Sequence, residues 1–544
     1  MSQKILEEKR GLNLLEDPRL NKLTAFTAQE REDLSLEGLL PPGMETLDRQ
    51  IERVLQQLAV KTNDLEQYIY LMQLLDINET LFYAVLMSDP ERFLPIVYDP
   101  TVGEACLKFG HIFRRPRGMY ITMKHKGRIA QVLRNWPIKD VRFICVSTGG
   151  RILGLGDLGS NGMGIPIGKL QLYTACAAVP PECLLPILLD CGTENKGLIN
   201  DPLYLGLKEP RTSTENLDEI VEEFVQAVQE VFPGCCIHFE DWKGIDAVRL
   251  LKKYTDKILC YNDDIQGTGS VALSGLLCAL KVKNERIKDQ KVMFLGGGSA
   301  AIGIANTIVA AMMLDGLTET EAQARISLFD IDGLIELSRK DLIPEQKVFC
   351  HDGAKPSKDL VQSIESFKPT ALIGVSTTGR AFNQQVIEAM SKLNARPIIF
   401  ALSNPTEKAE CTPEEAYKWS NGTALYAAGV QFKPVQLNGK TFLPGQANNF
   451  YIFPAIGLAV YATKAKRITN EMFVVAAQAL ADQVSDEMRQ QGLLYPPQSE
   501  MLKVALAVAA KVSQRVFDSG LAQVEKPADL NAWLKGMLYT PSYN

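Results

Sequence analysis

The sequence predicts an α/β fold in which an N-terminal helical region is followed by two parallel-sheet domains and by C-terminal helices. Apolar residues recur at helical spacing from about Leu47 to Leu94. Short apolar runs then alternate with helical segments from residue 141 to about residue 406. Strands separated by helices are typical of parallel sheets that are covered on both faces.

Composition limits the class of protein. The chain has 544 residues, 46% hydrophobic and 22% charged, with a net charge of −6. At roughly 100–200 residues per domain, this length predicts three or four domains. Lysine and arginine are scattered, so we expect no nucleic-acid partner.

Cysteine usage and hydropathy indicate the cellular compartment in which the protein is expected. The eleven cysteines lack the spacing of a disulfide framework, and many sit within or beside apolar runs, which predicts reduced, buried thiols. The N-terminus resembles neither a signal nor a transit peptide. The longest apolar windows, Val271 to Val282 and Val504 to Val512, are shorter than the ~20 residues that cross a bilayer. We therefore expect a cytoplasmic protein with no membrane partner.

The helical region ends in the segment LPIVYDPTVG, residues 94–103. Its β-branched run predicts a short strand that stops at Tyr98, Asp99 and Pro100. Proline restricts the residue before it, so the turn presents the Tyr98 ring at a defined angle. From the pattern alone, Tyr98 is either a packing residue or a catalytic group.

The first parallel-sheet domain has predicted strands at 141–147, 183–190, 235–241 and 258–261. Helices are expected at about 168–178 and 217–231, and a third ends at Tyr254. Ligands of such sheets gather at the carboxyl ends of the strands. Three of these strands end in acids, which are Asp190, the pair Glu240 and Asp241, and the pair Asp263 and Asp264.

The paired acids predict a metal site. A buried apolar run that leads into two carboxylates is costly unless a metal or another cation receives them. Glu240, Asp241 and Asp264 offer three hard oxygen ligands, which suit Mg²⁺ or Mn²⁺, whereas the four histidines form no zinc pattern. The alternative is that these acids cap helix N-termini.

The glycine-rich segment 149–170 supplies two further candidates. Arg151 could make a two-pronged contact with a carboxylate. Lys169 enters a helix in apolar surroundings, so we expect its pKa to be lowered enough for a base, especially beside a divalent cation. Together with a metal and a dinucleotide site, these residues indicate oxidation of a hydroxy acid.

A dinucleotide site is predicted by the segment KVMFLGGGSAAIGIAN, residues 291–306. Gly296, Gly298 and Ala301 form a G-x-G-x-x-A fingerprint between a strand and a helix, as in a Rossmann-type domain. The next strand ends in Asp330, which could accept from a ribose hydroxyl. Asp332 lies nearby and no arginine follows Asp330 immediately, so NAD is predicted as the cofactor and NADP is less favoured.

The chain resembles the malic enzyme family over nearly its whole length. The matching segments are Asp17-Pro18 through LNKLTAFT, LPIVYDPTVG, GHIFRRPRG, RILGLGDLGSNGMGIPIGKLQLYTAC, DPLYLGL, FEDW, YNDDIQGT, GGGSAAIGIAN, IIFALSNPT, AECTPEEAY and PGQANNFYIFPAIG. The resemblance implies oxidative decarboxylation of L-malate to pyruvate and CO₂ with reduction of NAD and a need for Mn²⁺ or Mg²⁺.

The resemblance also implies roles for individual residues. Lys169 matches the base, Asp263 the group that tunes it, and Tyr98 the acid that protonates the enol. The metal ligands are Glu240, Asp241 and Asp264, the substrate-binding residues are Arg151, Asn404, Asn448 and Asn449, and the cofactor-binding residues are Gly296, Gly298, Ala301, Asp330 and Asp264.

Domain boundaries and assembly follow from the same resemblance. We expect an N-terminal helical region at 1–115, a catalytic substrate and metal domain at 116–262 that is completed by about 450–522, a Rossmann-type domain at 263–449, and a tail at 523–544. A homodimer or homotetramer is expected.

Three residues depart from the family pattern. Asp99 adds a carboxylate beside Tyr98 that could change its acidity, and Thr148 and Gly150 replace two acids before Arg151. These departures leave open a non-catalytic metabolite-binding relative. A malolactic-type enzyme, which returns the hydride to give lactate, is a second alternative.

Overall fold

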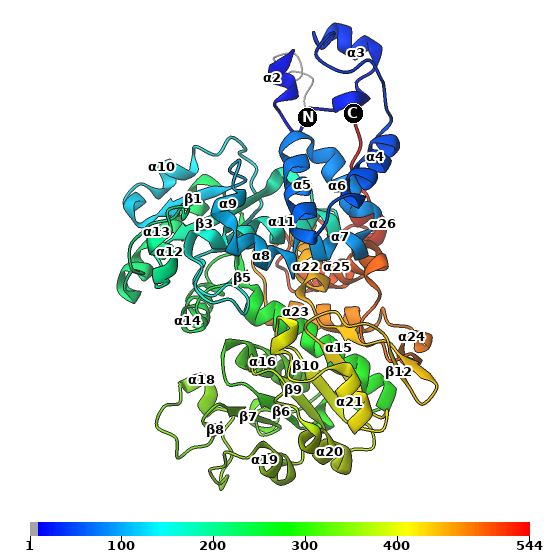
Figure 1. Ribbon diagram of the computed structural model, residues 1–544. Coiled ribbons are helices and arrows are strands. Elements are labelled where there is room, and N and C mark those ends of the chain that lie inside the picture. Colours follow the sequence, from blue (N-terminus) through cyan, green and yellow to red (C-terminus); the bar gives the residue numbers. More distant parts are fainter. Residues whose placement is uncertain (1–8, 544) are drawn as a thin grey trace.

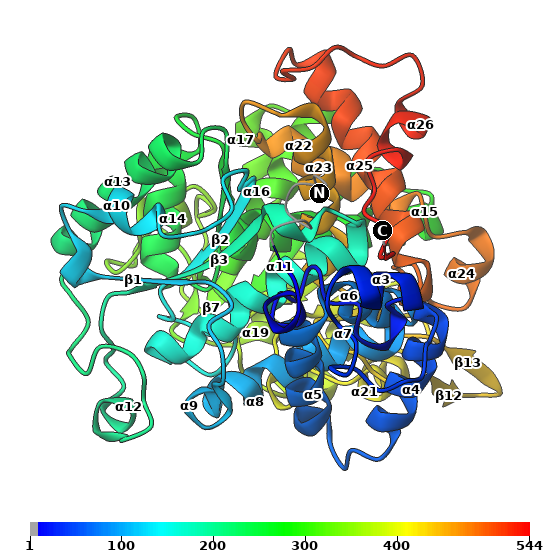
Figure 2. The ribbon, with the colours of Figure 1, turned by 90° about the horizontal axis from the view of Figure 1, so that it is seen from above.

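The computed structural model describes residues 9–543, so residues 1–8 and 544 of the predicted first and last segments lie outside the described residues. The N-terminal helices occupy one end of the molecule and the second sheet occupies the other (Figure 1). The first sheet and the C-terminal helices lie between these ends, side by side (Figures 1 and 2). The predicted α/β fold class is confirmed.

The N-terminal region is helical, as predicted. Its elements are α2 (Leu12–Leu15), η1 (Leu23–Ala25), α3 (Ala28–Asp33), α4 (Leu47–Ala59), α5 (Asp64–Ile77), α6 (Glu79–Ser88), α7 (Pro90–Val97), α8 (Thr101–Leu107) and α9 (Phe109–Ile112).

The strand predicted before Tyr98 was wrong, because this segment is helix α7. Asp89 caps the helix by accepting from the backbone N–H of Arg92, and Pro90 occupies the first turn. Both features start helices. The apolar positions Phe93, Leu94 and Val97 then face the core at helical spacing. Tyr98 ends α7 as its C-cap.

The first sheet has five parallel strands in the order β1-β3-β2-β4-β5. The strands are β1 (Met119–Thr122), β2 (Phe143–Ser147), β3 (Leu184–Asp190), β4 (Cys236–Phe239) and β5 (Cys260–Asn262). Its helices are α10 (Ile129–Leu133), α11 (Gly164–Ala177), α12 (Lys196–Asn200), α13 (Thr214–Val231) and α14 (Gly244–Tyr254). β2, β3 and β4 are fully buried, which explains why they read as continuous apolar runs.

The second sheet has the order β14-β11-β10-β9-β6-β7-β8, and all its pairs are parallel except β7 with β8. The strands are β6 (Val292–Leu295), β7 (Ile326–Asp330), β8 (Gly333–Leu334), β9 (Ala371–Gly374), β10 (Ile398–Ala401), β11 (Leu425–Ala428) and β14 (Gly445–Gln446), and β12 (Val435–Leu437) and β13 (Lys440–Phe442) form a separate hairpin. Its helices are α16 (Ser299–Leu314), α17 (Glu319–Gln323), α18 (Pro344–Lys347), α19 (Leu360–Phe367), α20 (Gln384–Leu393) and α21 (Pro413–Trp419).

A buried helix connects the two sheets. The π-helical turn η5 (Asp263–Gly267) continues directly into α15 (Thr268–Lys283). Among the described residues, only the segment Asp263–Lys283 is long and apolar enough, by length and composition, to span a membrane. This helix is longer than the apolar window Val271 to Val282 that was identified from the sequence. Its most apolar window is 78% buried inside the protein, as in a core helix.

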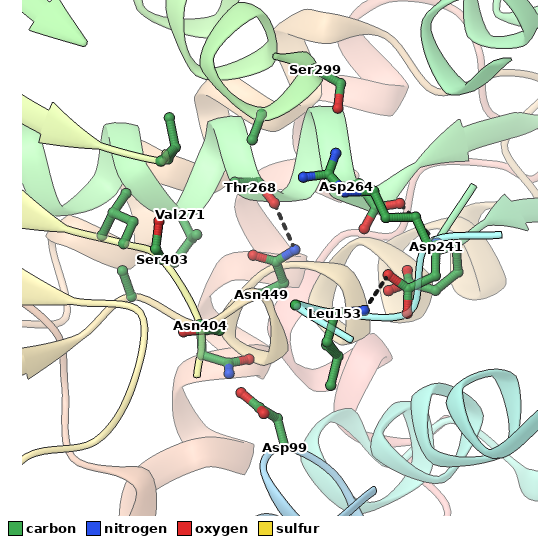
Figure 3. Close-up of a pocket in the computed structure, with 18 of the residues that line it drawn as sticks. Asp99, Leu153, Asp241, Asp264, Thr268, Val271, Ser299, Ser403, Asn404 and Asn449 are labelled. Carbon is green, nitrogen blue, oxygen red and sulfur yellow. Dashed lines mark hydrogen bonds between the residues drawn. The ribbon is translucent and has the colours of Figure 1, made fainter. Parts of the chain in front are cut away.

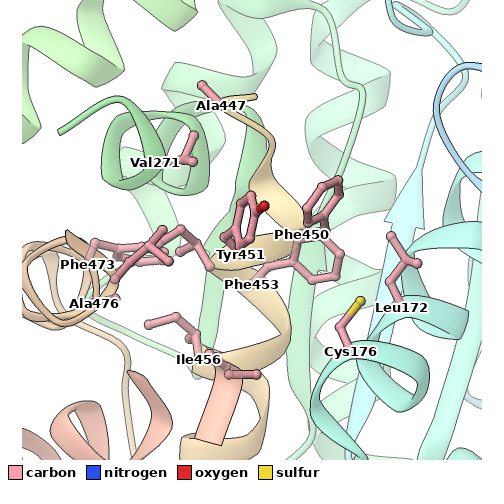
Figure 4. Packing of buried hydrophobic residues seen from close by; sticks show 14 of the residues in the cluster. Leu172, Cys176, Val271, Ala447, Phe450, Tyr451, Phe453, Ile456, Phe473 and Ala476 are labelled. Carbon is pink, nitrogen blue, oxygen red and sulfur yellow. The ribbon is translucent and has the colours of Figure 1, made fainter. Parts of the chain in front are cut away.

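The C-terminal helices pack on one another and, through α23, on α15, and they return the chain to its start. They are α22 (Phe453–Thr463), α23 (Asn470–Ala481), α24 (Asp486–Gln490), α25 (Met501–Asp518) and α26 (Leu530–Lys535), preceded by η8 (Asn449–Tyr451). Side chains of η8, α22 and α23 interlock with those of α11 and α15 (Figure 4). At the end of the chain, Tyr543 donates to Gln50 of α4 at 2.6 Å.

Gly457→Ala should lower the free energy of unfolding by about 1–3 kcal/mol, because overpacking outweighs the better helix propensity of alanine. A Cβ at Gly457 of α22 would lie 2.3 Å from Cε1 of Tyr173, whose ring is fully buried. Thermal unfolding followed by circular dichroism measures the change. Gly43→Ala is the control, because nothing lies within 4 Å of a Cβ at that exposed position. A Gly457→Ala protein as stable as the parent would contradict the packing argument.

Candidate active site

A cavity of about 200 Å³ lies where the carboxyl ends of both sheets face each other (Figure 3). Side chains that directly follow strands of both sheets and helix α7 line it, together with side chains of α11, η5 and η8. The structure brings together there Tyr98, Arg151, Lys169, Glu240, Asp241, Asp264, Asn404, Asn448 and Asn449. These residues span most of the chain, so the fold collects in one place the substrate and metal positions expected from the sequence.

Three acids form a candidate cation site. Glu240 and Asp241 follow β4, Asp264 lies in η5, and one oxygen of each lies within 4.8 Å of the others. Burial raises the pKa of Asp241 and Asp264 well above the usual range, and repulsion between the carboxylates raises them further. Oδ2 of Asp241 is buried and has no hydrogen-bond partner among the described residues. An orphaned buried oxygen among like charges fits a bound divalent cation.

The alternative in which these acids cap helices does not hold. Asn262 caps η5 by accepting from the backbone N–H of Ile265 at 3.0 Å. Helix α14, which follows Asp241, has Lys243 at its N-cap and no side-chain cap. The acids are therefore free to face the cavity.

Lys169 is buried on α11 between two carboxylates. Its Nζ lies 2.5 Å from Oδ2 of Asp263 and 3.1 Å from Oε1 of Glu240. Burial lowers the pKa of Lys169, but the attraction of these carboxylates outweighs burial and raises it well above the usual value. The prediction from the sequence that the pKa of Lys169 is lowered was therefore wrong.

Asp263 lies beneath Lys169 and is held by Asn449. The Asn449 side-chain amide donates to Oδ2 of Asp263 at 2.8 Å and to Oγ1 of Thr268 at 3.0 Å. Its nitrogen is thus engaged by the protein, whereas the buried Oδ1 of Asn404 has no hydrogen-bond partner in the described part of the chain. Both amide side chains belong to the lining of the cavity.

Tyr98 lies against Lys169, with the Lys169 Nζ 5.3 Å from the centre of its ring. A Cβ at position 168 would lie 2.9 Å from Cδ2 of Tyr98, so Gly168 permits the close approach. Burial raises the pKa of Tyr98, and its largest charge interactions are with Lys169 and the nearby acids Glu240, Asp241 and Asp263.

Asp99 points into the cavity below Asn404 (Figure 3). Burial raises the pKa of this carboxyl group to about 6, against the attraction of Lys169. The expected influence of Asp99 on the acidity of Tyr98 is not among the largest effects on that phenol. Asp99 instead adds a titratable group to the wall of the cavity.

The loop before Lys169 is held by an ion pair that sequence reasoning missed. Arg211 donates to both carboxylate oxygens of Asp157, at 3.0 and 3.1 Å, and its guanidinium lies 3.3 Å from where a Cβ of Gly150 would be. Gly149 has a φ of +65°, and its Cβ would lie 1.8 Å from the carbonyl oxygen of Gly159. This frame leaves Arg151 exposed at the cavity rim.

Behind the acids lies a buried network that was also missed. Nε2 of His238 lies 2.8 Å from Oε2 of Glu240, and Nδ1 lies 2.9 Å from the Tyr261 hydroxyl and 3.1 Å from the Tyr173 hydroxyl. Burial lowers the pKa of His238 to about 3. The signal was present in the spacing, because residues two apart on a strand share one face.

The glycine fingerprint has the predicted place between β6 and α16. Gly296 has a φ of +128°, and its Cβ would lie 2.7 Å from the carbonyl oxygen of Val375. Gly298 precedes α16 with nothing within 4 Å of its Cβ position, and Ala301 is buried in the first turn. Asp264 shares the cavity wall with Ser299 at the start of this helix (Figure 3).

Asp330 ends β7 beside a cation. Nη1 and Nη2 of Arg339 lie 2.7 and 3.0 Å from the two carboxylate oxygens of Asp330. Helix α18 lies on the same side, since the Gln346 amide donates to the Gly297 carbonyl at 2.8 Å, and its last residue is Lys347. The acid predicted to bind ribose is thus paired with an arginine.

Comparison with known proteins identifies the family. Residues 75–255 match the description "Malic enzyme, N-terminal domain", and residues 265–517 match "Malic enzyme, NAD binding domain". The chain is 47% identical to the NADP-dependent malic enzyme of Columba livia over 539 residues, which are 98% of this chain and 97% of that protein. The chain belongs to the malic enzyme family.

Other members of the malic enzyme family agree with this assignment. The human NADP-dependent malic enzyme is 45% identical over 538 residues, covering 98% of this chain and 94% of that protein. The crystal structure of the Entamoeba histolytica malic enzyme has a TM-score of 0.58 at 22% identity and covers 93% of this chain and 91% of that chain. The structural likeness supports the fold.

The predicted preference for NAD was wrong. Curated malic enzymes that are 45–47% identical to this chain are NADP-dependent. The prediction considered only the residues directly after Asp330. The fold returns the chain through β8 and brings Arg339 to within 2.7 Å of the Asp330 carboxylate, where the same guanidinium also contacts Asp341 at 2.5 Å.

Mn²⁺ at about 100 times its Kd should stabilise the folded protein by about 2.7 kcal/mol, because the cation binds the clustered acids only when they are assembled. Asp264→Asn should remove most of this gain. Melting temperatures with Mn²⁺ and with EDTA measure it. Asp190→Asn is the matched control, because Asp190 accepts from the backbone N–H groups of Gly192 and Leu207, at 3.0 and 2.8 Å. Equal stabilisation of Asp264→Asn and the parent would place the cation elsewhere.

Proposed function

We propose that this protein catalyses the oxidative decarboxylation of L-malate to pyruvate and CO₂ with reduction of NADP and with a divalent cation. The carrying observation is Lys169, which is buried between Asp263 and Glu240 at the floor of the cavity, directly beside the candidate cation site. Family membership supports the reaction, and the presence of Ser299 and Ala300 of the fingerprint helix in the cavity lining supports transfer of a hydride within the cavity.

Two groups from solution complete the site. Glu240, Asp241 and Asp264 would hold Mn²⁺ or Mg²⁺, and the loop from Gly296 to Ala301 would hold the dinucleotide phosphates. The bound cation supplies Lewis acidity toward the oxygens of the substrate and opposes the positive charge of Lys169, while the dinucleotide accepts the hydride.

Three residues of the chain then bind the substrate and transfer its protons. Arg151 at the rim offers a cation for a substrate carboxylate. Lys169 takes the proton from the C2 hydroxyl, and Asp263 at 2.5 Å stabilises the ammonium that results. After CO₂ leaves, Tyr98, whose ring lies against Lys169, protonates C3 of the enol of pyruvate.

Lys169→Ala should lower kcat by about 10²–10⁴-fold, because the proton on the substrate hydroxyl loses its acceptor. NADPH formation from malate with Mn²⁺ measures the rate. Lys503→Ala is the control, because that lysine is exposed on α25 and pairs with Glu500 three residues away. Normal turnover by Lys169→Ala would refute the role of this residue. Formation of lactate without net NADPH by the parent protein would instead favour the malolactic alternative.

NADP is proposed because the relatives at 45–47% identity are NADP-dependent and because an arginine side chain lies beside the acid that ends β7. Arg339 contacts Asp330 and Asp341, and Lys347 ends the helix that contacts the glycine loop. A guanidinium is suited to a phosphate because it donates in two parallel directions. The cation nearest to the Asp330 carboxylate is therefore the residue to test.

Arg339→Ala should raise KM for NADP about 10–100-fold and change KM for NAD much less, since a charge-assisted hydrogen bond contributes about 1.5–3 kcal/mol. Initial rates with both dinucleotides measure this. Arg286→Ala removes a comparable ion pair, with Asp315, away from the fingerprint and should leave both constants unchanged. A parallel rise for NAD and NADP would show that Arg339 acts on folding of the loop and not on the 2′-phosphate.

A further inference from the structure

The buried network of His238, Tyr173 and Tyr261 lies directly behind the candidate cation site. His238 is completely buried on β4, and the strand register pairs it with Tyr261 of β5. Tyr173 comes from α11, four residues after Lys169, and so projects from the same face of that helix. The network therefore joins the strand that carries Glu240 to the helix that carries Lys169.

The hydrogen bonds around His238 determine which tautomer of its imidazole ring is present. A carboxylate that binds a cation is ionised and can only accept, so Nε2 of His238 carries the hydrogen and donates to Oε2 of Glu240 at 2.8 Å. Nδ1 then has a lone pair and accepts from a tyrosine hydroxyl, Tyr261 at 2.9 Å or Tyr173 at 3.1 Å. The two hydroxyls also bond each other, so one phenol supports the other.

Packing prevents the imidazole from turning. The ring centres of His238 and Tyr261 are 4.5 Å apart with an angle of 32° between the planes, and Phe453 of α22 lies 5.7 Å away on another side. Tyr173 also contacts Phe453, with ring centres 5.3 Å apart. All four of these side chains are fully buried. A close-packed interior of this kind allows one rotamer for each ring.

The consequence appears at Glu240, whose two oxygens have different partners. Oε2 is occupied by His238, and Oε1 faces Lys169 at 3.1 Å on the side of the cavity. Without the donor on His238, Oε2 would be a buried acceptor without a partner and the carboxylate could rotate. Partners that orient ligating groups commonly contribute 10–100-fold to metal affinity.

We propose that His238 is a positioning residue, which with Tyr261 and Tyr173 fixes the Glu240 carboxylate so that one chosen oxygen is presented to the divalent cation. This role rests on the proposed function and adds to it a group that touches neither substrate nor cofactor. The network acts by hydrogen-bond direction, with the hydrogen on Nε2 and with Nδ1 as the acceptor.

Cation affinity of the purified full-length protein tests this role. His238→Leu should raise the Kd for Mn²⁺ by 10–100-fold in equilibrium titrations monitored by electron paramagnetic resonance. His238→Gln keeps an N–H donor at the reach of Nε2 and should stay within about 3-fold of the parent. The Kd for NADP should be unchanged in both, since the glycine fingerprint makes no contact with His238. Equal Mn²⁺ affinity of His238→Leu and the parent would overturn the proposal.

A second pair of variants covers the case in which His238→Leu does not fold. Tyr261→Phe removes one supporting hydroxyl and should weaken Mn²⁺ binding several-fold. Tyr417→Phe is the matched control, because Tyr417 is a buried tyrosine of the second sheet domain whose hydroxyl has no partner in the described region. Identical Mn²⁺ affinities for these two variants would contradict the network.

The imidazole itself can be observed in the parent protein. With ¹⁵N-labelled histidine only four side chains contribute, and His238→Gln assigns the signal of interest. We expect a neutral ring with hydrogen on Nε2 and none on Nδ1. Hydrogen on Nδ1 would overturn the assignment. If the parent binds Mn²⁺ with the expected His238 signal but makes no NADPH from malate, the proposed reaction fails while the positioning role stands.

Discussion

The rest of the site depends on one buried ion cluster, in which the Lys169 ammonium lies between the carboxylates of Asp263 and Glu240. Removing such charges from water costs several kcal/mol for each ion, and their mutual attraction offsets this only when the geometry is good. The fold supplies that geometry from three separate elements, α11, β4 and η5. Loss of any one of them would leave an uncompensated charge in the interior.

The cluster also explains why the chain is arranged around η5. Asp263 and Asp264 are adjacent, yet Asp263 faces Lys169 and Asp264 faces Asp241, whose backbone N–H donates to it at 2.8 Å. The same segment continues into α15 and packs against α16, where a Cβ at Gly303 would lie 2.6 Å from the Ile265 carbonyl. One turn thereby couples the floor of the cavity to the helix that begins at the dinucleotide fingerprint.

Electrostatic compensation recurs at the other sites. Arg211 balances Asp157 under the loop of Arg151, and Arg339 balances Asp330 at the end of β7. At the acid trio, by contrast, the described residues supply only Lys169 against the carboxylates, and an oxygen of Asp241 is left unpaired. The excess of carboxylates over cations and the unpaired oxygen distinguish this candidate cation site from the structural ion pairs elsewhere.

Much of the architecture and site was predictable from the sequence, because the relevant signals are local. Apolar runs of strand length, the acids at their ends and the glycine fingerprint lie within short stretches, so the sheets, the acid trio and the position of Lys169 could all be predicted. The strand expected before Tyr98 failed because a capping aspartate and Pro90 outweighed β-branched propensity. The pKa of Lys169, the cation beside Asp330 and the partner of Glu240 required the tertiary structure. Each is set by side chains far apart in the chain, and Coulomb and hydrogen-bond energies depend on distances in space that sequence spacing does not contain.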